Sequence, residues 1–278
     1  MTPLQPTLAS RLRADAVTVG YGGRPVVRDL SLDLPDGRVT SIIGPNGCGK
    51  STLLRTLARL LTPTSGRVVL DGDDIRGVRT RDIARRLALL PQTPVAPEGL
   101  LVRDLVGRGR HPHQRWFSQW SPEDEDVVEA ALRLTDTAEL RDRPLDQLSG
   151  GQRQRAWIAM TLAQDTDLLL LDEPTTYLDL AHQVEVLDLV TRLNRERGRT
   201  VAMVLHDLNL AARYSDVVVV MRDGVLVAHG TPGEVLTSDL LAQVFGLDAD
   251  VLDDPRTGLP IVVPRSSAAP RQTTGAKR

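Results

Sequence analysis

Short apolar segments alternate with longer segments of helical periodicity along most of this chain. Strands are predicted at residues 12–19, 26–34, 39–43, 66–70, 87–91, 168–171, 200–205, 217–221 and 225–229. Helices are predicted from a glycine-rich loop at 44–52 to about residue 61, and at 101–106, 127–134, 149–163 and 180–197. Strands that alternate with helices in this way predict an α/β protein with a mostly parallel sheet.

Turn signals and local composition divide the chain into parts. Pro35-Asp36-Gly37 predicts a hairpin turn, and Arg222-Asp223-Gly224 predicts a turn between the last two strands. Residues 1–10 lack a periodic pattern and residues 264–278 are rich in Ser, Thr, Pro and Gly, so both ends are expected to be disordered. The folded unit is expected at 11–263, with a core at about 11–93 and 165–245, an inserted helical part at about 100–164 and a C-terminal extension at 246–263.

Composition excludes several classes of protein. Of the 278 residues, 41% are hydrophobic and 25% are charged, which is typical of a soluble globular protein. The net charge of −2 gives no reason to expect a nucleic-acid partner. The single cysteine, Cys48, excludes an intrachain disulfide and a multi-cysteine metal site. No apolar segment approaches the ~20 residues that cross a bilayer, and the first ten residues do not form a signal peptide, so we expect a cytoplasmic protein.

The loop Gly44–Thr52 lies between a predicted strand and a predicted helix, the context that a phosphate-binding P-loop requires. Its glycines let successive amide N–H groups point at an anion, and the dipole of the following helix adds positive potential. Lys50, one of only two lysines in the chain, is expected to reach the β- and γ-phosphates, and the Ser51 hydroxyl to bind Mg²⁺. The predicted nucleotide-binding residues are Gly44, Pro45, Asn46, Gly47, Cys48, Gly49, Lys50, Ser51 and Thr52. The alternative is a glycine-rich turn that merely caps a helix.

An apolar strand that ends in two carboxylates supplies the second feature, Leu168–Glu173. A run of four leucines is typical of a parallel strand buried on both faces. Ligands in open α/β sheets bind at the carboxyl ends of the strands, so Asp172 and Glu173 are predicted to lie beside the P-loop. Asp172 would then hold Mg²⁺, and Glu173 would orient and deprotonate an attacking water as a general base. A strand that simply ends in a charged turn is the alternative.

The third feature is a helix start with the sequence Leu148, Ser149, Gly150, Gly151 and Gln152. Bare amides and a serine hydroxyl at a helix N-terminus suit an anion. Together with the P-loop, this pentapeptide closely resembles the signature motif of the ATP-binding subunits of ABC transporters. The resemblance to these subunits extends over about residues 12–263. The resemblance implies a RecA-like P-loop core with an N-terminal antiparallel β-subdomain and an inserted α-helical subdomain that carries the signature.

Further positions match the family's functional residues one at a time. The resemblance implies that Tyr21 stacks on adenine, that Gln92 senses Mg²⁺ and the attacking water, and that His206 contacts the γ-phosphate. Asp179, after Leu178, matches the turn that contacts a second subunit. The implied cofactors are ATP and Mg²⁺, with Ser51, Gln92 and Asp172 as the metal-binding residues.

The resemblance also implies partners. Two copies would pack head to tail, so that ATP lies between the P-loop of one copy and the signature of the other. Such a homodimer would act at the cytoplasmic face of the membrane, with an integral membrane permease and, indirectly, an extracytoplasmic substrate-binding protein. Hydrolysis of ATP to ADP and phosphate would thereby be coupled to transport.

Three segments resemble one group within the family, the ATPases of iron–siderophore, haem and cobalamin importers. They are residues 106–113, which approximate a Gly-Arg-x-Pro-His stretch with His111 inserted, residues 173–183, and the C-terminal segments 244–247 and 260–264. The function that this resemblance implies is ATP-driven import of an iron–siderophore or related metal chelate. The alternatives are an ABC ATPase for another cargo and a soluble ABC-type ATPase such as one in iron–sulfur assembly.

Two surface features leave alternatives open. Trp116, Phe117 and Trp120 either anchor a partner or form a small core under the helical part. We expect residues 92–97 and 101–114 to form a groove that receives a cytoplasmic helix of the permease. The arginine-rich segment 76–86 is interpreted as a solvated helix face rather than as a basic binding patch.

Overall fold

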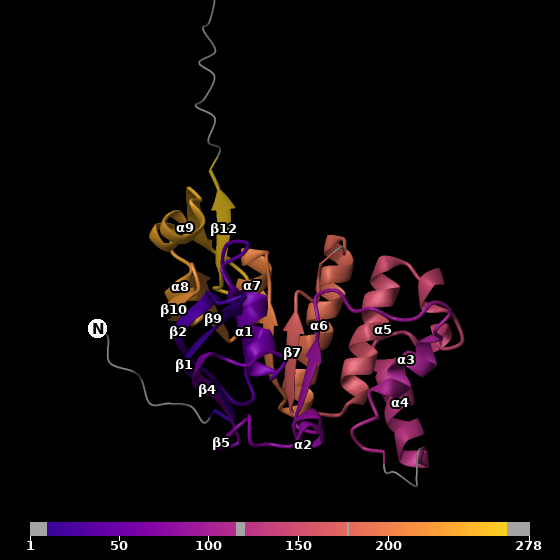
Figure 1. Cartoon of the computed structure of the whole chain (residues 1–278). Coiled ribbons are helices and arrows are strands. Elements are labelled where there is room, and N and C mark those ends of the chain that lie inside the picture. The colour runs from indigo at the N-terminus through magenta and orange to yellow at the C-terminus, as the bar shows by residue number, and fades with distance from the viewer. Residues whose placement is uncertain (1–9, 115–119, 177, 266–278) are drawn as a thin grey trace, which may run out of the picture.

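The computed structural model describes residues 10–114, 120–176 and 178–265 (Figure 1). These residues form a six-stranded sheet, a four-stranded sheet, a C-terminal two-stranded hairpin, and helices. The predicted α/β fold is confirmed. The ends expected to be disordered, residues 1–10 and 264–278, lie outside the described residues except for Ser10, Pro264 and Arg265, and Trp116 and Phe117 also lie outside them.

The six-stranded sheet carries the loops that matter for function. Its strand order is β10-β9-β3-β8-β7-β6. The strands are β3 (Val39–Ile43), β6 (Leu87–Leu90), β7 (Leu168–Asp172), β8 (Thr200–Val204), β9 (Val217–Arg222) and β10 (Val225–Gly230). Neighbours from β9 through β6 run parallel, and β10 pairs antiparallel with β9 across the turn predicted at 222–224.

Strand β7 shows why the central strands are continuously apolar. Leu168 and Leu170 pack in one hydrophobic cluster, with helix α1 (Lys50–Leu57) and the four-stranded sheet. Leu169 and Leu171 pack in the other cluster, with helices α5 (Gly150–Ala163) and α6 (Leu180–Arg197). Because successive side chains point to opposite faces of a sheet and both faces are covered, the four positions before Asp172 all favour apolar residues.

The four-stranded sheet has the order β2-β1-β4-β5 and is antiparallel. Its strands are β1 (Leu12–Tyr21), β2 (Arg24–Leu34), β4 (Ser65–Leu70) and β5 (Asp73–Asp74). The hairpin predicted at residues 35–37 is wrong, because β2 and β3 belong to different sheets and this turn carries the chain from one to the other. The first hairpin instead turns at Gly22 and Gly23, whose φ angles of 56° and 78° favour glycine.

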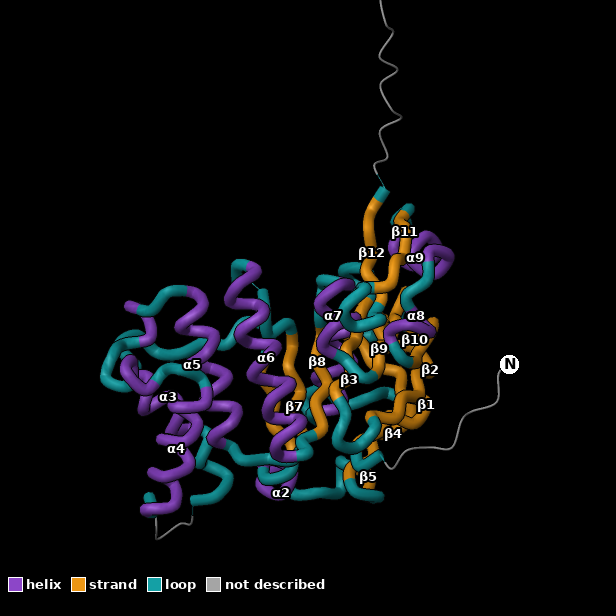
Figure 2. The backbone as a smooth tube through the Cα atoms, turned by 180° about the vertical axis from the view of Figure 1, so that it is seen from behind, coloured by secondary structure: helices purple, strands orange, loops and turns teal. Residues whose placement is uncertain are grey.

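The helices fall into two groups (Figures 1 and 2). Helices α3 (Val102–Arg108), α4 (Pro122–Leu134) and α5 lie together, beyond α6 and away from the four-stranded sheet. They form the predicted helical insertion, with short 3₁₀ turns at Ala138–Leu140 and Leu145–Gln147. The remaining helices are α2 (Thr80–Ala84), α7 (Leu208–Tyr214), α8 (Pro232–Val235) and α9 (Ser238–Phe245).

Two local predictions need correction. Helix α1 ends at Leu57 rather than near residue 61, since Arg59 adopts a left-handed φ of 58° that stops the helix. The segment 76–86 is not one helix with a solvated face. Helix α2 spans only five of these residues, and two arginines of the segment form hydrogen bonds to another part of the chain. Arg81 and Arg85 both donate to the carbonyl of Pro112, at 2.8 and 2.9 Å.

The C-terminal part is more structured than predicted. Strands β11 (Ala249–Asp253) and β12 (Pro260–Pro264) form an antiparallel hairpin, so the pair at 217–230 is not the last. Arg265 pairs with Asp250, so the fold extends past residue 263. Asn209 of α7 holds β12 through both backbone groups of Val262, accepting from its N–H at 2.7 Å and donating to its carbonyl at 3.2 Å. In the part of the chain that the structure describes, no helix has the length and apolar character needed to span a membrane.

Candidate active site

The loop after β3 wraps around its own lysine. Gly44, Gly47 and Gly49 have φ angles of 152°, 77° and 105°. A Cβ at Gly44 would lie 2.2 Å from the carbonyl oxygen of Met221, so a side chain cannot fit there. Lys50 starts α1, is 5% exposed, and donates from Nζ to the carbonyls of Gly44 (2.7 Å) and Pro45 (3.0 Å). The positive charge therefore sits inside the concave side of the loop.

Ser51 and Asp172 form a pair beside that lysine. The Ser51 hydroxyl donates to Oδ1 of Asp172 at 2.8 Å. Oδ2 of Asp172 is buried without a hydrogen-bond partner, and the nearest ion-pair partner is Nε of Arg55 at 3.9 Å. Burial raises the pKa of Asp172 above its ordinary value of 3.8, although Ser51 and Arg55 oppose the rise. An unpartnered buried oxygen next to a hydroxyl is a donor set that fits a hard cation such as Mg²⁺.

A protein cage for a metal ion does not occur in the described ranges. No group of three or more His, Cys, Asp or Glu residues is arranged there to hold one. A Mg²⁺ site does not require such a cage, because Mg²⁺ usually binds one or two protein ligands and completes its coordination shell with water and substrate phosphates. The pair Ser51–Asp172 supplies that number of ligands.

Glu173 lies at the centre of a hydrogen-bonded cluster. Its Oε1 pairs with Nε2 of His206 at 2.6 Å. Its Oε2 accepts from Nε2 of Gln92 at 2.7 Å and from the Thr176 hydroxyl at 2.9 Å. Burial raises the pKa of Glu173, but the hydrogen bonds from His206, Thr176 and Gln92 together with the charge of His206 outweigh it, so the pKa falls below 4.5. The carboxyl group is therefore ionised at neutral pH.

The backbone at Glu173 is strained. Its φ of 55° lies in the left-handed region, which long side chains rarely adopt. Such a conformation costs on the order of 1–3 kcal/mol and persists where the surroundings over-determine it. Here the three hydrogen bonds to its carboxylate fix the side chain in place. Thr176, which completes them, was not predicted, because a threonine on a loop carries no periodic signal.

One cavity of about 800 Å³ brings nine of the predicted site residues together. Its lining includes P-loop residues, Gln92, Glu173 and His206, contributed by the ends of β3, β6, β7 and β8. Tyr21 does not line it and lies half-exposed at the end of β1. The signature residues and Asp179 do not line it either.

The signature lies at the start of α5, and its outer residues face solvent. Leu148 is buried, whereas Ser149 and Gly150 are exposed. Ser149 caps the helix by accepting from the Gln152 N–H at 3.3 Å, and Gln152 accepts from the Ser149 N–H at 3.1 Å. Asp179 caps α6 in the same manner, and its Oδ1 lies 2.7 Å from Nδ1 of His182.

A glycine loop at the carboxyl end of a parallel strand, with a buried lysine and a carboxylate pair on another strand of the sheet, defines a P-loop nucleotide hydrolase. Residues 27–176 match the family model described as ABC transporter. The chain belongs to this family, as an ATP-binding subunit and an ATPase.

Relatives and solved structures agree with this assignment. The chain is 51% identical to the ferric enterobactin transport ATP-binding protein FepC of Escherichia coli (strain K12), over 94% of this chain and 96% of FepC. It is 52% identical to the iron(3+)-hydroxamate import ATP-binding protein FhuC of Bacillus subtilis (strain 168), over 90% and 93%. A structure described as a metal-chelate type ABC transporter in an inward-facing conformation superposes with a TM-score of 0.80 at 28% identity, covering 93% of this chain and 99% of that one.

Proposed function

We propose that this protein hydrolyses ATP to power the import of an iron–siderophore or a related metal chelate through a separate permease. The observation that supports this proposal most strongly is sequence identity. The chain is 51–52% identical, over at least 90% of its length, to proteins named for ferric enterobactin transport and iron(3+)-hydroxamate import. The likeness to a metal-chelate type transporter supports it. Import of another cargo and a role in iron–sulfur assembly are the alternatives that the experiment below separates.

The P-loop binds the phosphates of ATP in this proposal. Lys50 exchanges the carbonyls of Gly44 and Pro45 for phosphate oxygens, and Tyr21 stacks on the adenine. Asp172 and Ser51 hold Mg²⁺, with Gln92 close enough to respond to it. When bound, the ion neutralises charge that develops on the transferred phosphoryl group.

Glu173 is the general base in this proposal. Its lowered pKa keeps it ionised, so it can orient a water molecule and accept its proton. His206 contacts Oε1 of Glu173 and Gln92 donates to its Oε2. ATP in the cavity gives His206 a γ-phosphate to contact, which frees Oε1 of Glu173 for the water.

Two copies complete each site, because the signature lies outside the cavity of its own chain. We place residues 148–152 of one copy over the P-loop of the other, with Asp179 at the contact between them. Support comes from a dimeric structure of a bacterial ABC transporter cassette, which superposes with a TM-score of 0.71 at 27% identity. A related dimeric structure is bound to ADP and phosphate.

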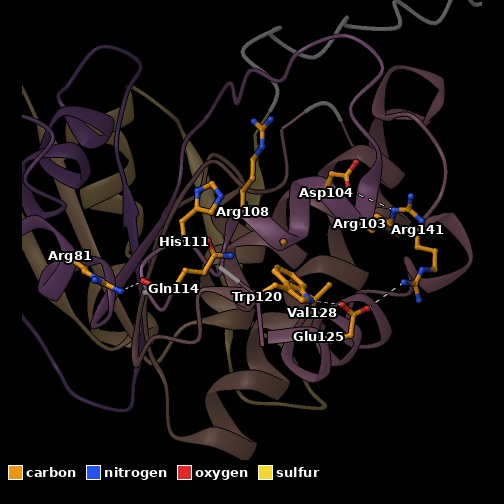
Figure 3. A pocket seen from close by; sticks show the side chains of 11 residues that line it. Arg81, Arg103, Asp104, Arg108, His111, Gln114, Trp120, Glu125, Val128 and Arg141 are labelled. Atoms are coloured by element: carbon orange, nitrogen blue, oxygen red, sulfur yellow. Dashed lines mark hydrogen bonds and ion pairs between the residues drawn. The ribbon is translucent and has the colours of Figure 1, made fainter. Parts of the chain in front are cut away.

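A second hollow, of about 1190 Å³, is our candidate for the permease contact (Figure 3). It lies between α2 and the helical group, and Arg108, His111 and Trp120 are among its lining residues. This site overlaps the groove expected at 101–114, but residues 92–97 do not line it. A permease contact places the protein at the cytoplasmic face of the membrane, with a substrate-binding protein on the other side.

Uptake of a radiolabelled iron chelate in a strain lacking the gene tests the proposal. The wild-type chain restores uptake, whereas Arg108→Ala keeps its ATPase rate and loses most uptake, because the groove loses an exposed charge. Arg79→Ala is the control, since Arg79 is also an exposed arginine but pairs with Asp82 and does not line the groove. Normal iron uptake in the deletion strain would refute chelate import, and normal uptake by Arg108→Ala would refute the groove.

A further inference from the structure

The segment 107–114 contacts the C-terminal end of α5, opposite to the end that carries the signature. Gly109 packs directly on α5, because a Cβ there would lie 2.3 Å from the carbonyl oxygen of Met160. The neighbouring side chains then reach the last carbonyls of α5. These carbonyls have no partner within their own helix and lie at the negative end of its dipole.

Arg110 and His113 satisfy those carbonyls. Arg110 is 3% exposed, donates from Nη1 to the Ala163 carbonyl at 3.0 Å and from Nε to Oδ1 of Asp124 at 2.8 Å. Nε2 of His113 lies 2.8 Å from the Gln164 carbonyl, so it carries the proton and donates. Asp124 is in the first turn of α4, so this cluster joins all three helices of the helical group.

The same cluster is attached to the core by two further connections. Nε2 of Gln164 donates to the carbonyls of Ala84 (2.7 Å) and Leu87 (3.0 Å), at the end of α2 and the start of β6. The Pro112 carbonyl accepts from Arg81 and Arg85 of the α2 region. Figure 3 shows Arg81 directed at Gln114, whose carbonyl it also contacts. We call residues 109–113 together with Gln164 the brace.

Helix α5 connects the brace to the signature. Its 14 residues span about 21 Å, with the brace at the C-terminal end and Ser149 at the other. Nearer the signature, α5 is attached to the α6 side by Arg155 with Glu185 at 2.7 Å and by Gln154 with the Pro174 carbonyl at 2.8 Å. Attachments near both ends of α5 fix the direction of the helix axis, whereas an attachment at one end alone would let the helix rotate about that point.

We propose that the brace positions the signature motif from the opposite end of α5, with His113 and Gln164 as the positioning residues. The consequence for hydrolysis rests on the proposed head-to-tail dimer, in which the signature must meet the other copy's nucleotide. Arg81, Gly107, His111 and Gln114 also line the hollow assigned to the permease. An occupant of that hollow would therefore contact the brace at His111, and would also lie against Arg81, which holds Pro112.

Distances between two spin labels on the nucleotide-free chain test the brace itself. The labels are attached to cysteines that replace two exposed residues, Gln147 next to the signature and Asp239 on α9. The native thiol is removed by Cys48→Ser in every variant. His113→Ala and Gln164→Ala are each expected to broaden the distance distribution, and His113→Gln, which keeps a donor, to narrow it again. Arg79→Ala, outside the brace, leaves it unchanged. Unchanged widths in both alanine variants, with unchanged melting temperatures, would overturn the proposal.

ATP-driven dimerisation in a Glu173→Gln background tests the consequence. Loss of one brace hydrogen bond is expected to weaken the ATP-bound dimer about five-fold, with ADP affinity of the monomer unchanged. Because Pro112 has two arginine donors, Arg81→Ala should weaken the dimer less than Gln164→Ala. Absence of a dimer in the Glu173→Gln parent would overturn the proposed dimer function alone, since the label distances still decide the brace. Equal dimer affinity with and without the brace would overturn the positioning role.

Discussion

The P-loop and the signature are both glycine-rich helix starts, yet they are built in opposite ways. At the P-loop, the functional side chains are buried and are held by partners from the same chain. Lys50 binds two loop carbonyls, Ser51 binds Asp172, and Glu173 has three partners. At the signature, Ser149 and Gly150 are exposed, and the cap is made by Ser149 and Gln152 alone.

This contrast explains how one chain can carry both parts without competition between them. Lys50 and Glu173 already have hydrogen-bond partners within the chain, so ATP binding exchanges hydrogen bonds at these two residues, whereas Oδ2 of Asp172 is buried without a partner. At the signature, Ser149 and Gly150 are exposed, while the N–H groups of Ser149 and Gln152 are bonded within the capping box. In the proposed function, the first region therefore sets affinity and chemistry within a chain, and the exposed residues of the second are available to another copy.

The largest expected effect comes from Glu173→Gln. An amide cannot accept the proton of water, so the hydrolysis rate should fall by about 10²–10⁴-fold while ATP still binds. Steady-state ATPase assays and size-exclusion chromatography with ATP measure the rate and the trapped dimer. Lys50→Ala is the contrasting variant, since it removes the phosphate-binding charge and should lose nucleotide binding as well. Full turnover by Glu173→Gln would show that the base is assigned to the wrong residue.

A smaller effect separates the cap from the function of the signature. Ser149→Ala removes a helix cap, which should lower the free energy of unfolding by about 1 kcal/mol, and should lower ATPase activity about ten-fold or more. Thr237→Ala is the control, because Thr237 also caps a helix with its hydroxyl, and that helix, α9, carries no signature or brace residue. It should cost similar stability, measured by urea unfolding, and leave the ATPase rate near normal. Equal losses of activity in both variants would show that Ser149 acts only as a helix cap and has no separate role in hydrolysis.

The smallest expected effect is a gain in stability from Asp172→Asn. Because the folded chain raises the pKa of Asp172, its ionised form lowers the free energy of unfolding above that pKa. Removing the charge should add about 1 kcal/mol at pH 7, although hydrolysis is lost. The gain should shrink as the pH falls through the raised pKa toward 3.8, where the wild-type carboxyl is protonated as well.

Urea unfolding at pH 7 and at about pH 4 measures this gain. Asp146→Asn, at an exposed position, provides the comparison and should change little at either pH. A stability loss in Asp172→Asn at neutral pH would mean that the buried carboxylate is better compensated than its unpartnered Oδ2 indicates.

The position of the candidate site in the P-loop region was largely predictable, because it follows from sequence-local rules. A continuous leucine strand ends in Asp172 and Glu173, and parallel strands bring their carboxyl ends to one edge. The structure places Gln92 and His206 in the same cavity. Their proposed roles, however, came from family resemblance, since a lone glutamine or histidine has no pattern of its own.

Other features depend on long-range contacts that no local pattern carries. The two-residue strand β5 is too short to show a period, and β11 and β12 carry only a weak alternation of burial. Pro35-Asp36-Gly37 is a genuine turn, but local sequence does not say which sheet the next strand joins. In the sequence, Arg81 and Arg85 cannot be distinguished from solvent-exposed arginines. Their structural role is the hydrogen bond that each donates to Pro112, about thirty residues away in the chain.

The attachment of β12 to Asn209 has a consequence for the order of events during synthesis. Helix α7 begins two residues after His206, and its partner Val262 lies 53 residues further along the chain than Asn209. At ribosomal rates of about 5–20 residues per second, that interval takes about 3–10 s. During this time the segment that follows His206 lacks the contact with β12, so this side of the candidate site reaches its final form only after Val262 has been made.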